Sequence, residues 1–200
     1  MHKDKIHNPI MKRINKSNLL ILIILFFFSG ELCAQKTNDD NLIYWSATRK
    51  LTTNDFGIKT KNQEKGTTLA QFCVDYQVKG FDFLTKNFNK KVHNYMIKSA
   101  SQIDTTANVQ QSLQYQQTLF NLCEIYARKL RKALRENRKK LISGLEIAKE
   151  LDNQIMTDFA NRKSEYTLDT SSATDQIKQQ KWESQIAKEL EELNEFAYEK

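Results

Sequence analysis

The chain has 200 residues, a formal net charge of +7, and 28% charged against 40% hydrophobic residues. This length suits one domain of ordinary size, and no internal repeat or shift in composition indicates a second one. The sequence contains no glycine-rich phosphate loop, no G-x-S-x-G nucleophile elbow and no paired-cysteine metal motif, so it gives no support to the enzyme classes that depend on them.

The N-terminal segment has the layout of a secretory signal peptide. Basic residues precede an unbroken apolar run at 19–28, and Leu32-Cys33-Ala34-Gln35 follows. The run is about half as long as the ~20 residues that a membrane span needs, so an N-terminal anchor is the alternative reading. We predict a signal peptide at 1–34 and one mature domain at 35–200, located in the periplasm, the envelope or the medium. Leu32 is larger than the residue that usually precedes a lipoprotein cysteine, which favours cleavage after Ala34.

Two cysteines, Cys73 and Cys123, remain in the predicted mature chain. They either pair in an oxidising compartment or lie as two buried thiols.

Strands are predicted in the first half of the mature chain. Residues 42–47 form a first apolar stretch, and 51–66 is polar and turn-rich, as expected of a loop. Apolar residues then alternate with polar ones over 70–78, the period of a strand with one face on a core. Phe81 and Phe83 indicate a shorter strand, and His93, Tyr95 and Ile97 another.

Helices are predicted in the second half. From Val109 apolar residues recur mostly at three- and four-residue spacing to about Lys140, and Gly144 marks a break. A second helix follows, then a polar loop at 164–172, then a last helix capped near Thr174 or Asp175. Strands followed by helices predict an α+β domain, with helices packed on one face of a small antiparallel sheet.

Two stretches resemble a known family. Trp45-Ser46-Ala47-Thr48-Arg49-Lys50-Leu51-Thr52-Thr53-Asn54-Asp55-Phe56 is similar to the W-S-x-x-R-x-L-T-W-x-D-F opening of a bacterial family of predicted secreted zinc-dependent proteases. Residues 120–132 contain Glu-Ile-Tyr-Ala-Arg-Lys-Leu-Arg, which that family carries on its H-E-x-x-H motif helix. The resemblance implies a zincin-like scaffold in which the long helix carries the metal site.

The chain departs from that family at the positions that would bind zinc. The motif places Tyr115 at the first His, Gln116 at the Glu and Leu119 at the second His, and a later motif places Ser172 at a third ligand. Leu119 has no lone pair, Gln116 is no base at neutral pH, and the Tyr115 phenol has a reference pKa near 10. The resemblance therefore implies a degenerate member with no metal and no cofactor.

The histidine count leads independently to the same expectation. Of three histidines, His2 and His7 lie in the predicted signal peptide, which leaves only His93. A catalytic zinc usually takes three protein ligands, most often including two or more histidines. Glu124 follows Tyr115 by nine residues, which at 100° per residue turns it to the opposite helix face. It is expected to be part of the helix scaffold.

A basic run on the long helix is a possible binding surface, with Arg128, Arg131, Arg135 and Arg138 as its arginines. An export signal and the lack of interleaved aromatic residues argue against nucleic acid. The alternatives are a solvated face opposite the acidic last helix, or a contact with a membrane surface or polyanion.

The leading hypothesis is an exported, catalytically inactive pseudoenzyme that binds an unknown protein, peptide or envelope partner. Membrane contact is expected only through the signal peptide or an anchor. One alternative is a hydrolase with an unrecognised constellation such as Tyr115, Gln116 and Glu124. Another is a structural envelope protein that uses the basic helix as its contact surface.

Overall fold

The computed structural model describes residues 39–61 and 68–200 of the chain. The predicted signal peptide at 1–34 lies outside the described residues. The described elements belong to one compact unit, Thr37–Lys200. In chain order the strands are β1 (Leu42–Tyr44), β2 (Ile58–Thr60), β3 (Leu69–Tyr76) and β4 (Val92–Asp104), and the long helices are α2 (Val109–Glu136), α3 (Glu146–Asp169) and α4 (Gln176–Glu192). The predicted α+β class is confirmed.

The sheet is built around β4, which pairs with every other described strand. β1 pairs antiparallel with the middle of β4, and β2 pairs parallel with its end. β3 pairs antiparallel along most of β4, with a register shift near its start. The predicted antiparallel sheet is therefore mixed, because the segment 51–66, predicted as a loop, contributes β2.

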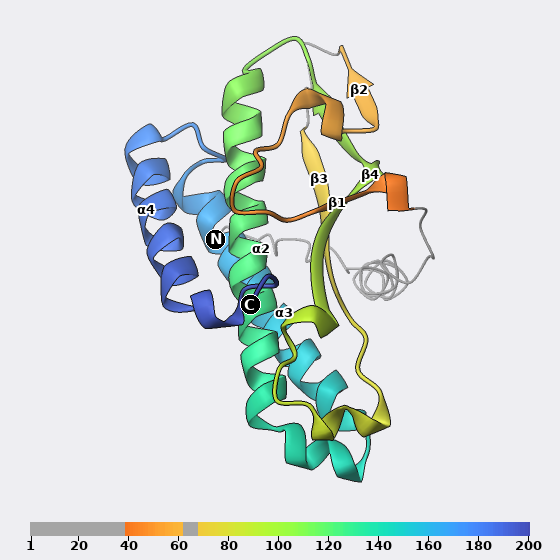
Figure 1. The fold of residues 1–200 in the computed structure, drawn as a ribbon. Coiled ribbons are helices and arrows are strands. Elements are labelled where there is room, and N and C mark those ends of the chain that lie inside the picture. The colour runs from red at the N-terminus through yellow and green to blue at the C-terminus, as the bar shows by residue number, and fades with distance from the viewer. Residues whose placement is uncertain (1–38, 62–67) are drawn as a thin grey trace, which may run out of the picture. The chain divides into compact units, whose positions relative to one another are not determined.

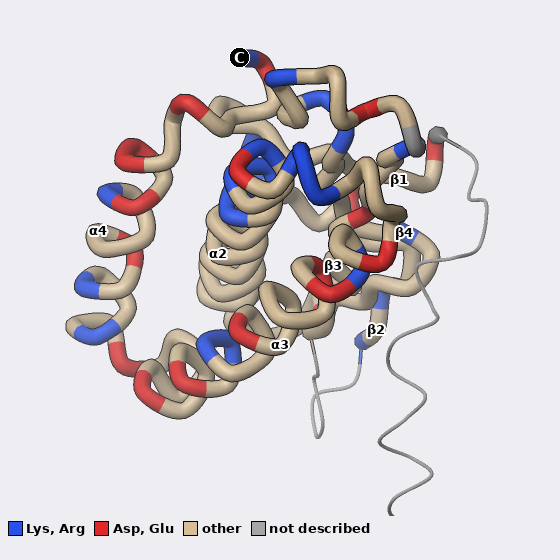
Figure 2. The backbone as a smooth tube through the Cα atoms, turned by 90° about the horizontal axis from the view of Figure 1, so that it is seen from below, with Lys and Arg blue, Asp and Glu red and all other residues tan. Residues whose placement is uncertain are grey.

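α2 lies across one face of the sheet, and α3 and α4 pack on the far side of α2 (Figure 1). Seen along its axis, α2 is surrounded by these layers (Figure 2). Its apolar side chains join three buried clusters. One faces the sheet and contains Phe120 stacked on Phe72, a second lies against α3 and α4, and a third lies toward the end of α2. This burial on several sides stabilises the long helix.

Two local predictions are wrong. Phe81 and Phe83 lie in a short helix, η5 (Gly80–Leu84), not in a strand, because the Lys79 N–H donates to the Asp82 carboxylate at 2.6 Å and turns the chain. Residues 164–169 continue α3 instead of forming a loop. Tyr166 is fully buried there and donates to Gln179 of α4 at 2.8 Å.

The ends of the helices agree more closely with the predictions made from the sequence. α2 ends at Glu136, and a short helix, η7 (Arg138–Ser143), leads to Gly144, whose φ of 133° suits glycine alone. The Asp175 side chain caps α4 by accepting the Lys178 N–H at 3.1 Å, as predicted.

A buried ionic network lies on the side of α2 that faces β4. Glu124 is 1% exposed, and its Oε1 accepts Arg128 Nε at 3.1 Å and Arg131 Nη1 at 2.7 Å. Its Oε2 accepts the Asn94 side-chain amide of β4 at 3.2 Å. Both arginines are also buried, at 4% and 1% exposure.

The two arginines carry this network to three other segments. Arg131 donates to the backbone oxygens of Val92 and Phe196, each at 3.0 Å, and Arg128 donates to that of Leu190 at 2.5 Å. Glu124 therefore anchors α2 to β4, to α4 and to the segment that follows α4.

This burial corrects the predicted basic surface. Arg128 and Arg131 do not face solvent, whereas Arg135 pairs with Glu195 at 2.6 Å and Arg138 is half-buried. The exposed basic residues of this run are the lysines Lys132, Lys139 and Lys140. Of the two alternatives for Cys73 and Cys123, a bond between them is not formed, because Cys123 is a free, buried thiol. Burial raises its pKa, so it is an unreactive thiol.

Removing Arg131 takes away a buried partner of Glu124 and the donors to two buried backbone oxygens, those of Val92 and Phe196. We expect Arg131→Met to lower the free energy of unfolding by about 3–5 kcal/mol, because these acceptors lose their hydrogen bonds and Glu124 keeps only Arg128 as its ionic partner. Lys132→Met, next to it but with a side chain 47% exposed, is the control and should change it by less than about 0.5 kcal/mol. Urea unfolding followed by circular dichroism measures both; equal values would contradict a structural role of the network.

Candidate functional site

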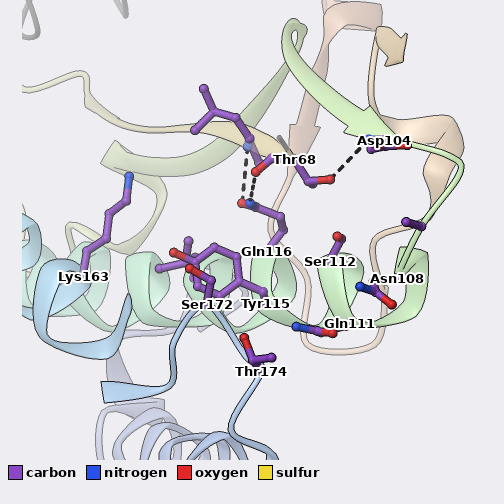
Figure 3. Close-up of a pocket in the computed structure, with 14 residues that line it drawn as sticks. Thr68, Asp104, Asn108, Gln111, Ser112, Tyr115, Gln116, Lys163, Ser172 and Thr174 are labelled. Atoms are coloured by element: carbon purple, nitrogen blue, oxygen red, sulfur yellow. Dashed lines mark hydrogen bonds between the residues drawn. The ribbon is translucent and has the colours of Figure 1, made fainter. Parts of the chain in front are cut away.

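A cavity of about 520 Å³ opens between the start of β3, the first turns of α2 and the loop that joins α3 to α4. All four predicted degenerate positions, Tyr115, Gln116, Leu119 and Ser172, line it. Figure 3 shows Gln116 and Tyr115 on α2 with Ser172 and Thr174 on the facing loop. Residues more than fifty positions apart in the sequence are thus brought to one place.

The α3–α4 loop has an unusual backbone. Ser171, Ser172 and Ala173 are consecutive left-handed residues, with φ of 48°, 56° and 64°. Each such non-glycine residue costs roughly 1–2 kcal/mol, so the surroundings must hold them. The Ser172 N–H donates to Thr167 O at 3.0 Å, and the Ala173 N–H donates to the Thr170 hydroxyl at 3.1 Å. The loop is therefore held in place beside the cavity.

Tyr115 is tied to α3. Its hydroxyl lies 2.7 Å from the Thr167 hydroxyl, and its ring stacks on Tyr166 with centroids 5.3 Å apart. Thr167 already donates to Lys163 O at 2.7 Å, so Tyr115 is the donor between the two hydroxyls. The phenol proton is committed to a structural bond.

Gln116 fastens α2 to the start of β3. Its amide nitrogen donates to Thr68 O at 3.0 Å, and its amide oxygen accepts the Ala70 N–H at 3.3 Å. The side chain is 1% exposed, so both bonds form away from water. Only an amide can donate and accept in this way, which gives Gln116 a structural reason to replace a carboxylate.

These four positions do not form a zinc site. Leu119 is 2% exposed and packs in an apolar cluster, and Ser172 offers only a hydroxyl. Within residues 39–61 and 68–200, no group of three or more His, Cys, Asp or Glu is arranged to hold a metal ion. The donor set therefore does not fit the zinc ion that the H-E-x-x-H motif of the resembled family would hold.

Two charged residues line the cavity, Asp104 and Lys163. Hydrogen bonds from the Thr106 hydroxyl and N–H, at 2.6 and 2.7 Å, lower the pKa of Asp104. The carboxylate is thus ionised and turned to its own loop. The rest of the lining is mostly hydroxyl and amide groups, which suit polar contacts with a neutral backbone. No sequence pattern identifies Thr68, Lys163 or Thr174 as neighbours of this cavity.

Glu124 lies at another hollow, of about 250 Å³, whose lining includes Tyr44, Trp45, His93 and Tyr198. Its position on the opposite face of α2 agrees with the spacing argument. Tyr115, Gln116 and Glu124, the alternative constellation, are therefore not brought together. The His93 ring donates a hydrogen bond from Nδ1 to the Asp75 carboxylate at 3.1 Å and packs against two tyrosines, as a structural residue would.

No family model, curated protein or solved structure matches the chain. The resemblance to zinc-dependent proteases stays a prediction. None of the helices in the described part of the chain has both the length and the apolar composition needed to cross a bilayer.

Gln116→Glu tests the role of the amide. The introduced carboxylate would lie against Thr68 O with no proton to donate, so we expect a loss of about 1–3 kcal/mol of unfolding free energy at pH 8. Burial should raise its pKa in the folded state, so folding binds a proton and the loss shrinks as the pH falls through that value. Gln180→Glu, at an exposed position on α4, is the control and should change the unfolding free energy little. Thermal unfolding between pH 4 and 8 measures this loss of unfolding free energy. A loss that does not depend on pH would contradict the proposed bonds of Gln116.

Proposed function

We propose that the protein is an exported, non-catalytic binding protein related to zinc-dependent proteases, and that its cavity holds an extended peptide. The observation that carries this proposal is the convergence of Tyr115, Gln116, Leu119 and Ser172 on one cavity. The side chains of Tyr115, Gln116 and Leu119 are committed to packing and to structural hydrogen bonds. In this proposal the cavity corresponds in position to the active site of a protease, while Tyr115 and Gln116 serve the fold.

The outer edge of β3, which pairs with no other strand among residues 39–61 and 68–200, supports an extended peptide as the ligand. Gln77 N–H donates to Lys91 O at 2.7 Å, so the odd-numbered residues of this strand direct their backbone groups at β4. Phe72 and Val74 direct theirs to the other side, where β3 pairs with no described strand. Such an edge can take up an extended segment through backbone hydrogen bonds.

The cavity lies at the beginning of this edge. Thr68, Leu69 and Ala70 line it, and the Gln116 amide already shows there how a planar amide pairs with the strand. A peptide that continues this pattern along β3 would place its side chains over the hydroxyl- and amide-rich lining. This arrangement binds backbone atoms and provides no activated water or nucleophile.

A defined mixture of unstructured peptides tests the proposal. A tryptic digest of casein is incubated with the protein, the complex is separated by size exclusion, and the peptides that co-elute are identified by mass spectrometry. We expect intact peptides to co-elute. Ser112→Trp, which fills the cavity from α2, should weaken the binding of a recovered peptide at least about tenfold, since it removes the space for that chain.

Gln110→Trp is the matched control, because Gln110 lies on the same helix turn but lines a different hollow. It should leave peptide affinity unchanged. If wild type shortens the peptides and Ser112→Trp does not, the result would favour a hydrolase instead. If no peptide co-elutes with the protein, the proposal is overturned.

A further inference from the structure

Four large apolar side chains project into solvent at the end of the protein where α2 finishes. Phe81 and Leu84 of η5 are 81% and 72% exposed, Ile142 of η7 is 64% exposed, and Leu145 after it is 42% exposed. The two short helices pack against each other, so these side chains belong to one surface. We name this surface the apolar tip. It lies roughly 30 Å along α2 from the cavity, at about 1.5 Å per residue.

The apolar tip is not a frayed part of the core. Its neighbours Phe83 and Leu141 point inward and pack in the cluster at this end of α2, Leu141 at 1% exposure. Each short helix thus packs one apolar side chain into the core and exposes at least one other to solvent. Single exposed apolar residues are common on proteins, but a group of four on one projecting surface indicates a contact.

Cations surround the apolar tip. The segments 79–91 and 137–145 contain seven Lys or Arg and one acid, Asp82, and two further acids, Glu136 and Glu146, border the second segment, so basic residues still exceed acids. Asp82 is paired with Lys91 at 3.0 Å, so its charge is compensated. The basic residues are Lys79, Lys86, Lys90, Lys91, Arg138, Lys139 and Lys140. Figure 2 looks onto this end, and its blue segments lie around the end of α2.

The opposite end of the helices offers a comparison. Leu168 and Ile177 are 80% and 84% exposed near the α3–α4 loop. Acids accompany them, since Asp169 pairs with Lys178 and Asp175 caps α4. Equal apolar exposure thus occurs there without an excess of positive charge.

We propose that the apolar tip docks on the surface of an anionic lipid bilayer. Phe81, Leu84 and Ile142 would enter the boundary between headgroups and acyl chains, and the flanking lysines would contact lipid phosphates. A bilayer suits a projecting surface, because it needs no complementary groove. The proposal does not depend on peptide binding in the cavity, and it gives the protein a membrane contact besides any N-terminal signal or anchor.

A tryptophan placed at the apolar tip reports docking in the full-length chain. Phe81→Trp is mixed with vesicles of phosphatidylcholine, or of equal parts phosphatidylcholine and phosphatidylglycerol, that contain brominated lipid as a quencher. Wild-type emission, from Trp45 and Trp182, is subtracted. We expect the added tryptophan to shift to the blue and to be quenched by the anionic vesicles much more than by the neutral ones.

Ile177→Trp, at a position as exposed but at the other end, is the matched control. It should show neither effect, even if another part of the chain attaches to the vesicles. In the Phe81→Trp background, Lys86→Glu with Lys139→Glu should reduce vesicle partitioning at least about tenfold. Lys181→Glu with Lys188→Glu, which makes the same change in net charge on α4, should reduce it much less.

Three results would overturn the proposal. One is equal quenching of the two added tryptophans, and another is an equal effect of the two lysine pairs. The third is a blue shift of the added tryptophan at position 81 that rises with protein concentration when no vesicles are present, because it would assign the apolar tip to contact between copies of this chain.

Discussion

The buried contact of Glu124 with Arg128 and Arg131 is the interaction on which the arrangement of the protein depends. These residues follow one another at i, i+4 and i+7 on α2, so they lie along one side of the helix. Through them α2 is bonded to Asn94 and Val92 of β4, to the backbone oxygen of Leu190 in α4 and to that of Phe196 after it. Three buried charges are tolerated because each is paired and hydrogen-bonded.

This network explains why the Glu-Ile-Tyr-Ala-Arg-Lys-Leu-Arg run is the most specific part of the family resemblance. Its charged residues hold the helix in place, and Ile125, Tyr126 and Leu130 between them are buried in the apolar clusters. The motif residues one to three turns earlier, at 115, 116 and 119, face a different side. A chain can therefore keep the scaffold half of such a helix and change the half that faces the cavity.

Much of the fold could be predicted from periodicity. The alternation at 70–78 gave β3, and the three- and four-residue spacing after Val109 gave α2, because these elements bury one regular face. Sequence patterns failed where tertiary contacts decide. β2 is three residues long and exists through its pairing with β4, and α3 continues through a polar stretch because Tyr166 is buried against α4. The basic run predicts an exposed surface, because no local sequence pattern distinguishes an arginine that binds a buried Glu124 from one that is solvated.

The site was predicted in part. The motif comparison aligns Tyr115, Leu119 and Ser172 with ligand positions, and these three residues line one cavity. It could not foresee that the Gln116 amide pairs with β3, because that bond depends on where a strand forty-six residues earlier begins. The left-handed turn at Ser171–Ala173 likewise contains no glycine or asparagine from which it could be predicted.

We propose that the cavity and the outer edge of β3, which pairs with no other described strand, together hold an extended peptide without cutting it. Amide hydrogen exchange, followed by NMR with and without a casein peptide that co-elutes with the protein, tests this most directly. We expect slower exchange at the outward N–H groups of Phe72 and Val74, with Gln71 and Cys73, which face β4, nearly unchanged. Protection confined to other parts of the protein, or cleavage of the peptide during the measurement, would contradict it.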